Sequence, residues 1–127
     1  MVAGELVLLV EDNEKNMKLL RDVLQATGCR TIEARTGEEA VRLAGEELPA
    51  LVLMDIQLPG IDGTTALQRL RDDGRTVGIP VVALTAQAMR GDRERFLAAG
   101  FDDYMSKPVD VREFMDLVRR YCAEDGT

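Results

Sequence analysis

The sequence predicts an α/β fold of the doubly wound class, in which a five-stranded parallel sheet is covered by helices on both faces. Short apolar runs of strand length alternate five times with longer segments whose apolar residues recur at helical spacing. Because short connections and right-handed crossovers make successive strands parallel, this alternation favours one sheet between two helical layers. The chain has 127 residues and no linker, repeat or low-complexity stretch. We therefore expect residues 1–127 to form a single domain with five helices.

The first strand is predicted at residues 6–10, which are all apolar, as a strand buried on both faces of its sheet should be. From Asn13 the apolar residues take helical spacing, and Gly28 supplies the stop signal of this first helix. Residues 31–34 are predicted to form a short second strand.

The second helix opens at a predicted capping box, in which Thr36 and Glu39 have the spacing to satisfy each other's backbone donors. This helix is expected to end before Pro49. Residues 51–54 are apolar and follow as a third buried strand, which ends at Asp55.

The same alternation continues beyond the third strand. A turn rich in proline and glycine covers residues 58–63, and a helix covers residues 64–72. Pro80 holds the residue before it in an extended conformation and leads into a fourth strand at residues 81–84.

The last two helices enclose the fifth strand. A helix at residues 90–99 is expected to end at Gly100, and residues 103–106 form the strand. A second capping box, formed by Asp110 and Glu113, opens the final helix. The apolar residues of this helix repeat at helical spacing, so that one of its faces should pack on the sheet.

The composition excludes several classes of function. The net charge of −7 makes the surface repel nucleic acid phosphates and anionic lipids, so we expect no direct binding to nucleic acid or membrane. No apolar run reaches the length of a signal peptide or a membrane span, so a cytoplasmic location is expected. The chain contains no histidine, which excludes a phosphorylatable histidine, a Ser-His-Asp triad and the usual catalytic zinc sites.

Charged and hydroxyl side chains follow four of the five predicted strands. The first strand is followed by Glu11 and Asp12, the third ends at Asp55, the fourth at Thr85, and the fifth leads to Lys107. In a doubly wound sheet, ligands bind at the edge formed by the carboxyl ends of the strands. We therefore expect these side chains to lie together in one site.

The residue types in this predicted site indicate phosphoryl transfer assisted by a divalent cation. Neighbouring carboxylates repel one another unless a cation lies between them, and oxygen ligands suit Mg²⁺, for which Mn²⁺ could substitute. Asp55 is the expected nucleophile, because it projects from a central strand and carboxylates can form aspartyl-phosphates. Lys107 could pair with one phosphoryl oxygen as a point charge, and Thr85 could donate a hydrogen bond to another.

Each of these residues has an ordinary structural explanation when it is taken alone. The helix dipole favours acidic residues at a helix start, a threonine suits a strand, and a single lysine is commonly a surface residue. The prediction of a functional site depends on their occurrence together and in this order.

Four stretches of the sequence carry a family resemblance. They are Leu9-Val10-Glu11-Asp12-Asn13, Leu53-Met54-Asp55-Ile56-Gln57-Leu58-Pro59-Gly60, Ala83-Leu84-Thr85-Ala86 and Ser106-Lys107-Pro108. With them the whole chain resembles the receiver domains of bacterial response regulators, the CheY-like family. The resemblance implies the strand order 2-1-3-4-5 of the flavodoxin/CheY-like fold and a role in two-component or phosphorelay signalling. It also implies a signalling protein and not an enzyme, apart from its own phosphorylation and dephosphorylation.

The resemblance implies a role for each residue of the acidic cluster. Asp55 is the phosphoacceptor and also a metal ligand, and Asp12 binds Mg²⁺ directly. Glu11 helps through a water molecule, and the backbone carbonyl of Gln57 is a further ligand. Glu11 stands where many members of the family have aspartate, and its longer side chain is expected to preserve water-mediated binding.

The resemblance also implies a switch. Lys107 and Thr85 sense the phosphoryl group, and Tyr104 matches an aromatic residue that turns inward when Thr85 moves. The bond between Lys107 and Pro108 is expected to be cis. This movement would shift the face formed by the last two helices and the fifth strand, which binds other proteins. The candidate arginines on this face are Arg90, Arg93 and Arg112.

The expected partners are a histidine kinase or a histidine phosphotransfer protein as the phosphoryl donor, and a downstream signalling protein as the target. A chain of this length has no room for an output domain, so it looks most like the stand-alone members of the family. The alternative is a receiver domain excised from a hybrid histidine kinase or from a larger regulator.

Two other classes of protein share part of this set of residues. A phosphatase of the haloacid dehalogenase class also places Asp, Thr and Lys around Mg²⁺, but Gln57 here replaces the second acid of its nucleophile motif. A pseudo-receiver would act as an unphosphorylated scaffold. The residues that argue against it are the intact Asp12, Asp55, Thr85 and Lys107.

Overall fold

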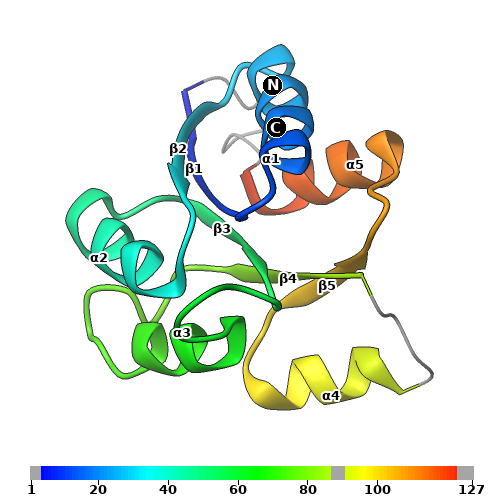
Figure 1. Cartoon of the computed structure of the whole chain (residues 1–127). Helices are drawn as coiled ribbons and strands as arrows, with labels where there is room; N and C mark the ends of the chain where they lie inside the picture. The colour runs from blue at the N-terminus through cyan, green and yellow to red at the C-terminus, as the bar shows by residue number, and fades with distance from the viewer. Residues whose placement is uncertain (1–3, 87–90, 123–127) are drawn as a thin grey trace.

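The computed structural model describes residues 4–86 and 91–122, and in them it has the parallel sheet that the sequence predicts (Figure 1). The strands lie in the order β2-β1-β3-β4-β5, and every neighbouring pair is parallel. The strands are β1 (Leu6–Val10), β2 (Arg30–Ala34), β3 (Leu51–Asp55), β4 (Val81–Thr85) and β5 (Asp103–Ser106). The helices are α1 (Glu14–Ala26), α2 (Gly37–Glu47), α3 (Gly63–Arg71), α4 (Asp92–Ala99) and α5 (Val111–Cys122). The fold class and strand order are confirmed.

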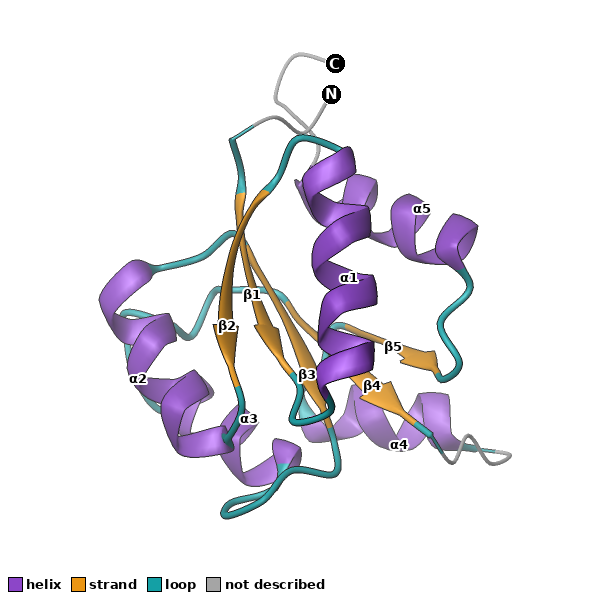
Figure 2. Cartoon of the chain, turned by 45° about the horizontal axis from the view of Figure 1, so that its top comes forward, coloured by secondary structure: helices purple, strands orange, loops and turns teal. Residues whose placement is uncertain are grey.

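The sheet separates two hydrophobic cores. Helices α1 and α5 cover one face, and α2, α3 and α4 cover the other, as the turned view in Figure 2 shows. Successive side chains of a strand point to opposite faces, so Val7 and Leu9 enter the first core while Leu8 and Val10 enter the second. All four side chains are fully buried, which explains why β1 is apolar throughout and not alternating.

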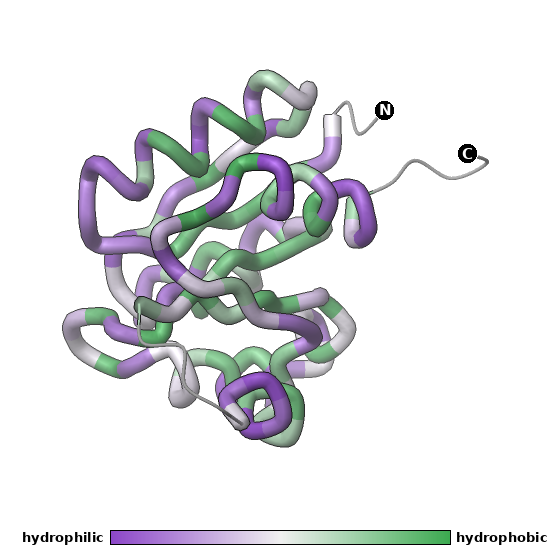
Figure 3. Tube along the Cα trace, turned by 90° about the vertical axis from the view of Figure 1, so that its right-hand side faces the viewer, coloured by the Kyte–Doolittle hydropathy of each residue, from purple (hydrophilic) through white to green (hydrophobic). Residues whose placement is uncertain are grey.

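The hydropathy of the residues follows the arrangement of the sheet and the two helical layers. Apolar residues run along the central strands, and hydrophilic residues alternate with apolar ones along the outer helices (Figure 3). Within the described residues, no helix is both long enough and apolar enough to cross a membrane. Helices α1, α2, α3 and α5 are instead amphipathic and present an apolar stripe to the sheet, whereas the short α4 buries mainly Phe96.

The element boundaries differ from the predicted ones by one or two residues. Strand β2 begins at Arg30, whose backbone N–H donates to the Glu5 carbonyl at 2.8 Å. Strand β4 includes Thr85, which pairs with Ser106 of β5. Backbone pairing therefore continues one residue beyond each of these predicted strands, at the polar residues Arg30 and Thr85. Helix α4 begins two residues after the predicted start, Arg90, which lies outside the described residues.

The capping box predicted for α2 is only half correct. The Thr36 hydroxyl accepts a hydrogen bond from the Glu39 backbone N–H at 3.1 Å, as predicted. The Glu39 carboxylate, however, accepts from the backbone N–H of Arg35 at 2.7 Å, one residue before the cap. The Glu39 side chain therefore accepts its hydrogen bond from the residue before the N-cap and not from the N-cap itself. At α5, Asp110 accepts from the Glu113 N–H at 3.0 Å, and the described residues contain no return bond from the Glu113 side chain.

Arg71, the last residue of α3, ties together the segments on either side of β4. Its guanidinium donates to the carbonyls of Val77 at 3.0 Å, Ile79 at 2.7 Å and Gly100 at 2.9 Å. It also pairs with the Asp102 carboxylate at 2.9 Å. These carbonyls belong to loops, so a single planar side chain satisfies acceptors that no strand or helix pairs.

We predict that Arg71→Lys lowers the free energy of unfolding by about 2 kcal/mol, because an ammonium cannot reach all of these acceptors and leaves part-buried carbonyls unsatisfied. Urea unfolding followed by circular dichroism measures the change. The matched control is Arg69→Lys, because Arg69 is exposed on the same helix. Equal stability of the two variants would contradict the role given to Arg71.

Candidate functional site

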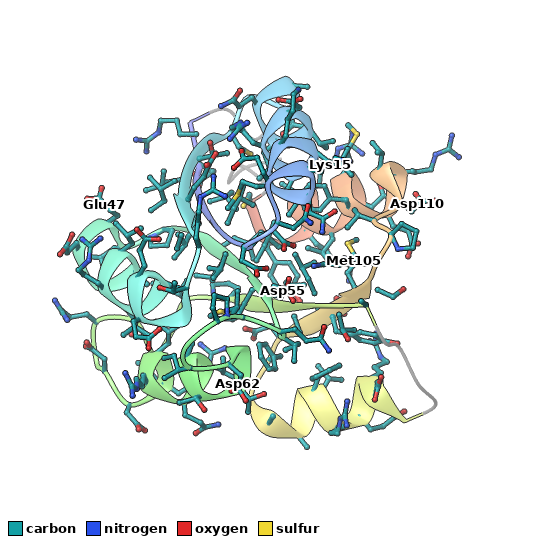
Figure 4. All side chains as sticks on the ribbon, viewed as in Figure 1. Lys15, Glu47, Asp55, Asp62, Met105 and Asp110 are labelled. Atoms are coloured by element: carbon teal, nitrogen blue, oxygen red, sulfur yellow. The ribbon has the colours of Figure 1, made fainter. Side chains whose placement is uncertain are left out.

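The predicted site residues lie at one edge of the sheet, where four parallel strands end. Glu11 directly follows β1, Asp55 is the last residue of β3, and Thr85 is the last residue of β4. Lys107 directly follows β5, and its backbone N–H donates to the Thr85 carbonyl at 2.8 Å. Figure 4 labels Asp55 at this edge, near the centre of the sheet. Parallel pairing in register therefore brings together side chains that are far apart in the sequence.

The ammonium of Lys107 lies between two buried carboxylates. Its Nζ is 2.7 Å from Glu11 Oε1 and 2.6 Å from Asp55 Oδ2. The side-chain exposure is 1% for Glu11, 6% for Asp55 and 16% for Lys107. Two carboxylates withdrawn from water in this way need a counter-charge, and Lys107 supplies it.

The remaining oxygen of each carboxylate is bonded to backbone. Asp55 Oδ1 accepts from the Gln57 N–H at 2.9 Å, and Glu11 Oε2 accepts from the Asn13 N–H at 3.1 Å. Each bond joins a carboxylate to the residue two positions further on, in the loop that leaves its strand. The carboxylates are therefore fixed in orientation.

Burial and ion pairing have opposite effects on the pKa of Glu11 and on the pKa of Lys107. Burial raises the pKa of Glu11, and the hydrogen bond from Lys107 only partly offsets that effect. Burial lowers the pKa of Lys107, but the hydrogen bonds and charges of Asp55 and Glu11 outweigh it, so the pKa is raised. Lys107 therefore keeps its positive charge at neutral pH.

The third carboxylate, Asp12, completes an acidic cluster. One carboxylate oxygen each from Glu11, Asp12 and Asp55 lie within 4.8 Å of one another. Unlike the other two, Asp12 is exposed, and its side chain makes no hydrogen bond or ion pair with any described residue. When all groups are ionised, the three carboxylates and Lys107 leave a net charge of −2. An oxygen-only donor set with this charge fits a hard divalent cation such as Mg²⁺.

Thr85 and Tyr104 lie on neighbouring strands beside this cluster. Thr85 is buried, and Tyr104 of β5 pairs in register with Ala83, two residues before Thr85 on β4. The Tyr104 ring is half-buried and packs on Phe96 of α4 with ring centroids 5.7 Å apart. Its backbone N–H donates to the Asp103 carboxylate at 2.8 Å. Tyr104 therefore joins β5 to α4.

Two of the predicted surface arginines, Arg93 and Arg112, lie within the described residues, and their surroundings differ. Arg93 of α4 reaches the buried carboxylate of Asp103, with 3.5 Å between Nη1 and Oδ1, and Arg120 of α5 reaches its other oxygen at 3.0 Å. Arg112 is exposed on α5. The sequence did not single out Asp103 or Arg120. The available sequence signal for this contact was an acidic residue in a predicted strand, together with arginines in both flanking helices.

The roles predicted for Lys107 at a phosphoryl oxygen and for Glu11 at a metal-bound water stay predictions. The structure adds a contact that the sequence does not predict. The Lys107 ammonium, which binds Asp55, also binds Glu11 directly. The sequence could not reveal this contact, because the two residues are joined only by the pairing of β1, β3, β4 and β5. The peptide bond between Lys107 and Pro108 is cis, as predicted.

A cluster of carboxylates around a lysine at the carboxyl edge of a 2-1-3-4-5 sheet is typical of receiver domains. The sequence of residues 7–119 matches the response regulator receiver domain, and the chain therefore belongs to that family. It is thus a receiver domain of two-component signalling, as the resemblance predicted.

Individual relatives are similar over nearly the whole chain. The polar-differentiation response regulator DivK of Brucella anthropi is 48% identical over 118 residues, which cover 93% of this chain and 96% of that protein. DivK of Brucella ovis has the same identity and coverage. Both relatives are matched along nearly their full length.

Solved structures of other receivers have the same fold. The receiver domain of the sensor histidine kinase PA1611 of Pseudomonas aeruginosa is 37% identical, with a TM-score of 0.87 over 96% of this chain and 100% of that one. Its structure contains a magnesium ion coordinated in the active-site cleft. A chain in the co-crystal structure of the Saccharomyces cerevisiae phosphotransfer protein Ypd1 with the receiver domain of Ssk1 is 30% identical, with a TM-score of 0.86 over 94% of this chain and 90% of that one.

We predict that Lys107→Met lowers the free energy of unfolding at pH 7 by about 3 kcal/mol, because it leaves two buried carboxylates without a cation. Adding Glu11→Gln to this variant should restore part of the loss, since it removes one of the uncompensated charges. Urea unfolding of the single and double variants measures both effects. Lys18→Met is the control, because Lys18 makes only an exposed ion pair on α1. A loss no larger than that of the control would refute a structural role for Lys107.

Proposed function

We propose that this receiver domain spans residues 1–127 and accepts a phosphoryl group on Asp55 in a reaction that requires Mg²⁺. The observation that supports this proposal is the setting of Asp55. Its carboxylate ends a central strand, contacts Lys107 at 2.6 Å and lies within 4.8 Å of oxygens from Glu11 and Asp12. A carboxylate in that setting has a cationic group for the incoming phosphoryl oxygens and further carboxylate oxygens beside it that could hold a metal ion.

The transfer would proceed by attack of one Asp55 oxygen on phosphorus. The bond from phosphorus to the donor's histidine nitrogen breaks, and its electron pair stays on that nitrogen, which then takes up a proton. A bound Mg²⁺ supplies charge neutralisation for the carboxylates and the phosphoryl oxygens. Asp12, Asp55 and the Gln57 carbonyl would hold the ion directly, and Glu11 would hold it through water. Lys107, already in contact with Asp55, would bind one phosphoryl oxygen.

The output of the domain would be a change on the face made by α4, β5 and α5. Thr85 would bind a second phosphoryl oxygen, and Tyr104 on the neighbouring strand would turn inward. On this face a hollow of about 210 Å³ is lined by the following residues: Arg93, Asp103, Tyr104, Met105, Glu113, Asp116, Leu117 and Arg120. Asp103, which precedes Tyr104 in the sequence, binds arginines from both α4 and α5. A movement of Tyr104 would therefore change the positions of these two helices.

The partners that we propose follow from the family. Ypd1 is a histidine phosphotransfer protein that has been crystallised with a receiver domain similar to this chain. We infer a donor of the same class or a histidine kinase, and a downstream protein that binds the α4-β5-α5 face. The similarity to DivK over nearly its full length supports a stand-alone cytoplasmic regulator. The second possibility, a receiver belonging to a hybrid kinase, is supported by the similarity to the PA1611 receiver.

The proposal predicts that incubation with acetyl phosphate and Mg²⁺ adds one phosphoryl group to the wild-type protein. Intact mass spectrometry measures the gain, with and without EDTA. Asp55→Asn should abolish the gain, because an amide oxygen does not form an aspartyl-phosphate. Asp62→Asn is the matched control, since Asp62 is an exposed helix cap after the same strand.

A gain that requires both Mg²⁺ and Asp55, and that Asp62→Asn leaves unchanged, supports the proposal. No gain in the wild-type protein under any condition would point to a scaffold that is not phosphorylated. A gain that persists in Asp55→Asn would place the acceptor elsewhere.

A further inference from the structure

The loop that carries Gln57, residues 56–62, is fastened to the sheet at its C-terminal end. The Gly63 N–H donates to the Ile56 carbonyl at 3.1 Å. A methyl group on Gly63 would lie 2.6 Å from the Asp55 carbonyl oxygen, which is closer than atoms of these types approach. Glycine at position 63 therefore lets the start of α3 close against the end of β3. This contact fixes the two ends of the loop but not its middle.

The middle of the loop is held from outside, by the first turn of α2. The Ile61 N–H faces Glu38 Oε2 at 3.4 Å. A methyl group on Gly60 would come within 2.5 Å of Glu38 Oε1, so the carboxylate lies directly against the loop backbone. A methyl group on Gly37 would lie 2.5 Å from Ile61 Cγ1 and 2.7 Å from the Ile61 carbonyl oxygen.

These contacts hold together two segments that are distant in the sequence, namely the loop at residues 56–62 and the start of α2. Gly60 has φ +76°, a conformation that glycine adopts without strain, and it bends the loop toward α2. Gly37 is buried although it starts a helix, because Ile61 occupies the space where a side chain would be. The loop therefore packs on the first turn of α2. Gly60 and Ile61 of the loop contact Glu38 and Gly37 of the helix.

We propose that Glu38, with Gly37, clamps the loop and so sets the position of the Gln57 carbonyl, which makes Glu38 a positioning residue for the Mg²⁺ site. The proposal rests on the proposed function, since it concerns the same metal. Glu38 is exposed on α2 and lies outside the acidic cluster of Glu11, Asp12 and Asp55. Its effect on the metal would pass through the backbone from Ile61 to Gln57.

A purely structural role for Glu38 must be distinguished from this one. Glu38 lies in the first turn of α2, where an acidic side chain stabilises a helix through its dipole. It also contributes to the negative charge that attracts any cation. Glu47, the last residue of the same helix, is exposed and lies at the end of α2 away from Asp55 (Figure 4). Glu47→Ala therefore removes the same charge without touching the loop.

The experiment titrates Mg²⁺ into the wild type, Glu38→Ala, Glu38→Gln and Glu47→Ala, following backbone amides by NMR and heat by calorimetry. We expect Glu38→Ala to weaken Mg²⁺ binding about tenfold, as loss of a residue that orients a ligand does. Glu38→Gln keeps an acceptor oxygen for the Ile61 N–H and should stay within about twofold of the wild type, as should Glu47→Ala. Without Mg²⁺, the Gln57 and Ile61 amide signals should shift in Glu38→Ala and remain in place in Glu47→Ala. Thermal unfolding midpoints report whether each variant is folded.

Equal Mg²⁺ affinity for the wild type and a folded Glu38→Ala would overturn the proposal. So would an equal loss in Glu38→Ala and Glu47→Ala, because that loss would come from net charge alone. A loss in Glu38→Gln as large as in Glu38→Ala would also count against the clamp. If the wild type bound no Mg²⁺, the proposed function would fail, and unshifted loop amides in Glu38→Ala would then separately refute the clamp.

Discussion

The contact of one ammonium with two buried carboxylates is the interaction on which the site depends. Glu11 and Asp55 are almost completely withdrawn from water, and a buried carboxylate without a partner costs several kcal/mol, or takes up a proton. Lys107 offsets this cost from the position directly after β5, which is separated from β1 by β3 and β4. The ends of β1, β3 and β5 must therefore hold their relative positions for both contacts of Lys107 to persist. The Asp55 carboxylate is thereby held in a fixed orientation, which favours nucleophilic attack on phosphorus.

The rest of the fold provides that rigidity. The central strands β1, β3 and β4 are apolar on both faces, so two cores hold the sheet and leave the polar groups of these strands at its carboxyl edge. Among the described residues, every buried side-chain nitrogen and oxygen has a hydrogen-bond partner. Arg71 satisfies loop carbonyls beside β4, and Asp103 joins β5 to α4 and α5. The polar contacts thus lie between elements, where a change at the site can be passed to a surface.

The sequence predicted the fold well, because hydrophobic spacing depends on local geometry that every α/β protein shares. It also predicted which side chains gather at the edge, since parallel strands end there. The sequence did not show the contact of Lys107 with Glu11, the displaced bond of Glu39, or the packing of Glu38 on Gly60. These depend on register and loop conformation, which set side-chain positions to within an ångström and leave no periodic pattern. Glycines 37 and 60 carried a signal, but their partners could be identified only in three dimensions.

The location of a bound cation is the most direct measurement of what this cluster does. Crystals soaked with Mn²⁺ in place of Mg²⁺ would give an anomalous difference map in which the ion can be placed without ambiguity. We predict one strong peak at the edge of the sheet, coordinated by Asp12, Asp55 and the Gln57 carbonyl, with Lys107 retained beside the cluster. A peak elsewhere on the acidic surface, or none at concentrations that saturate other receivers, would contradict a metal-assisted phosphoryl-transfer site at Asp55.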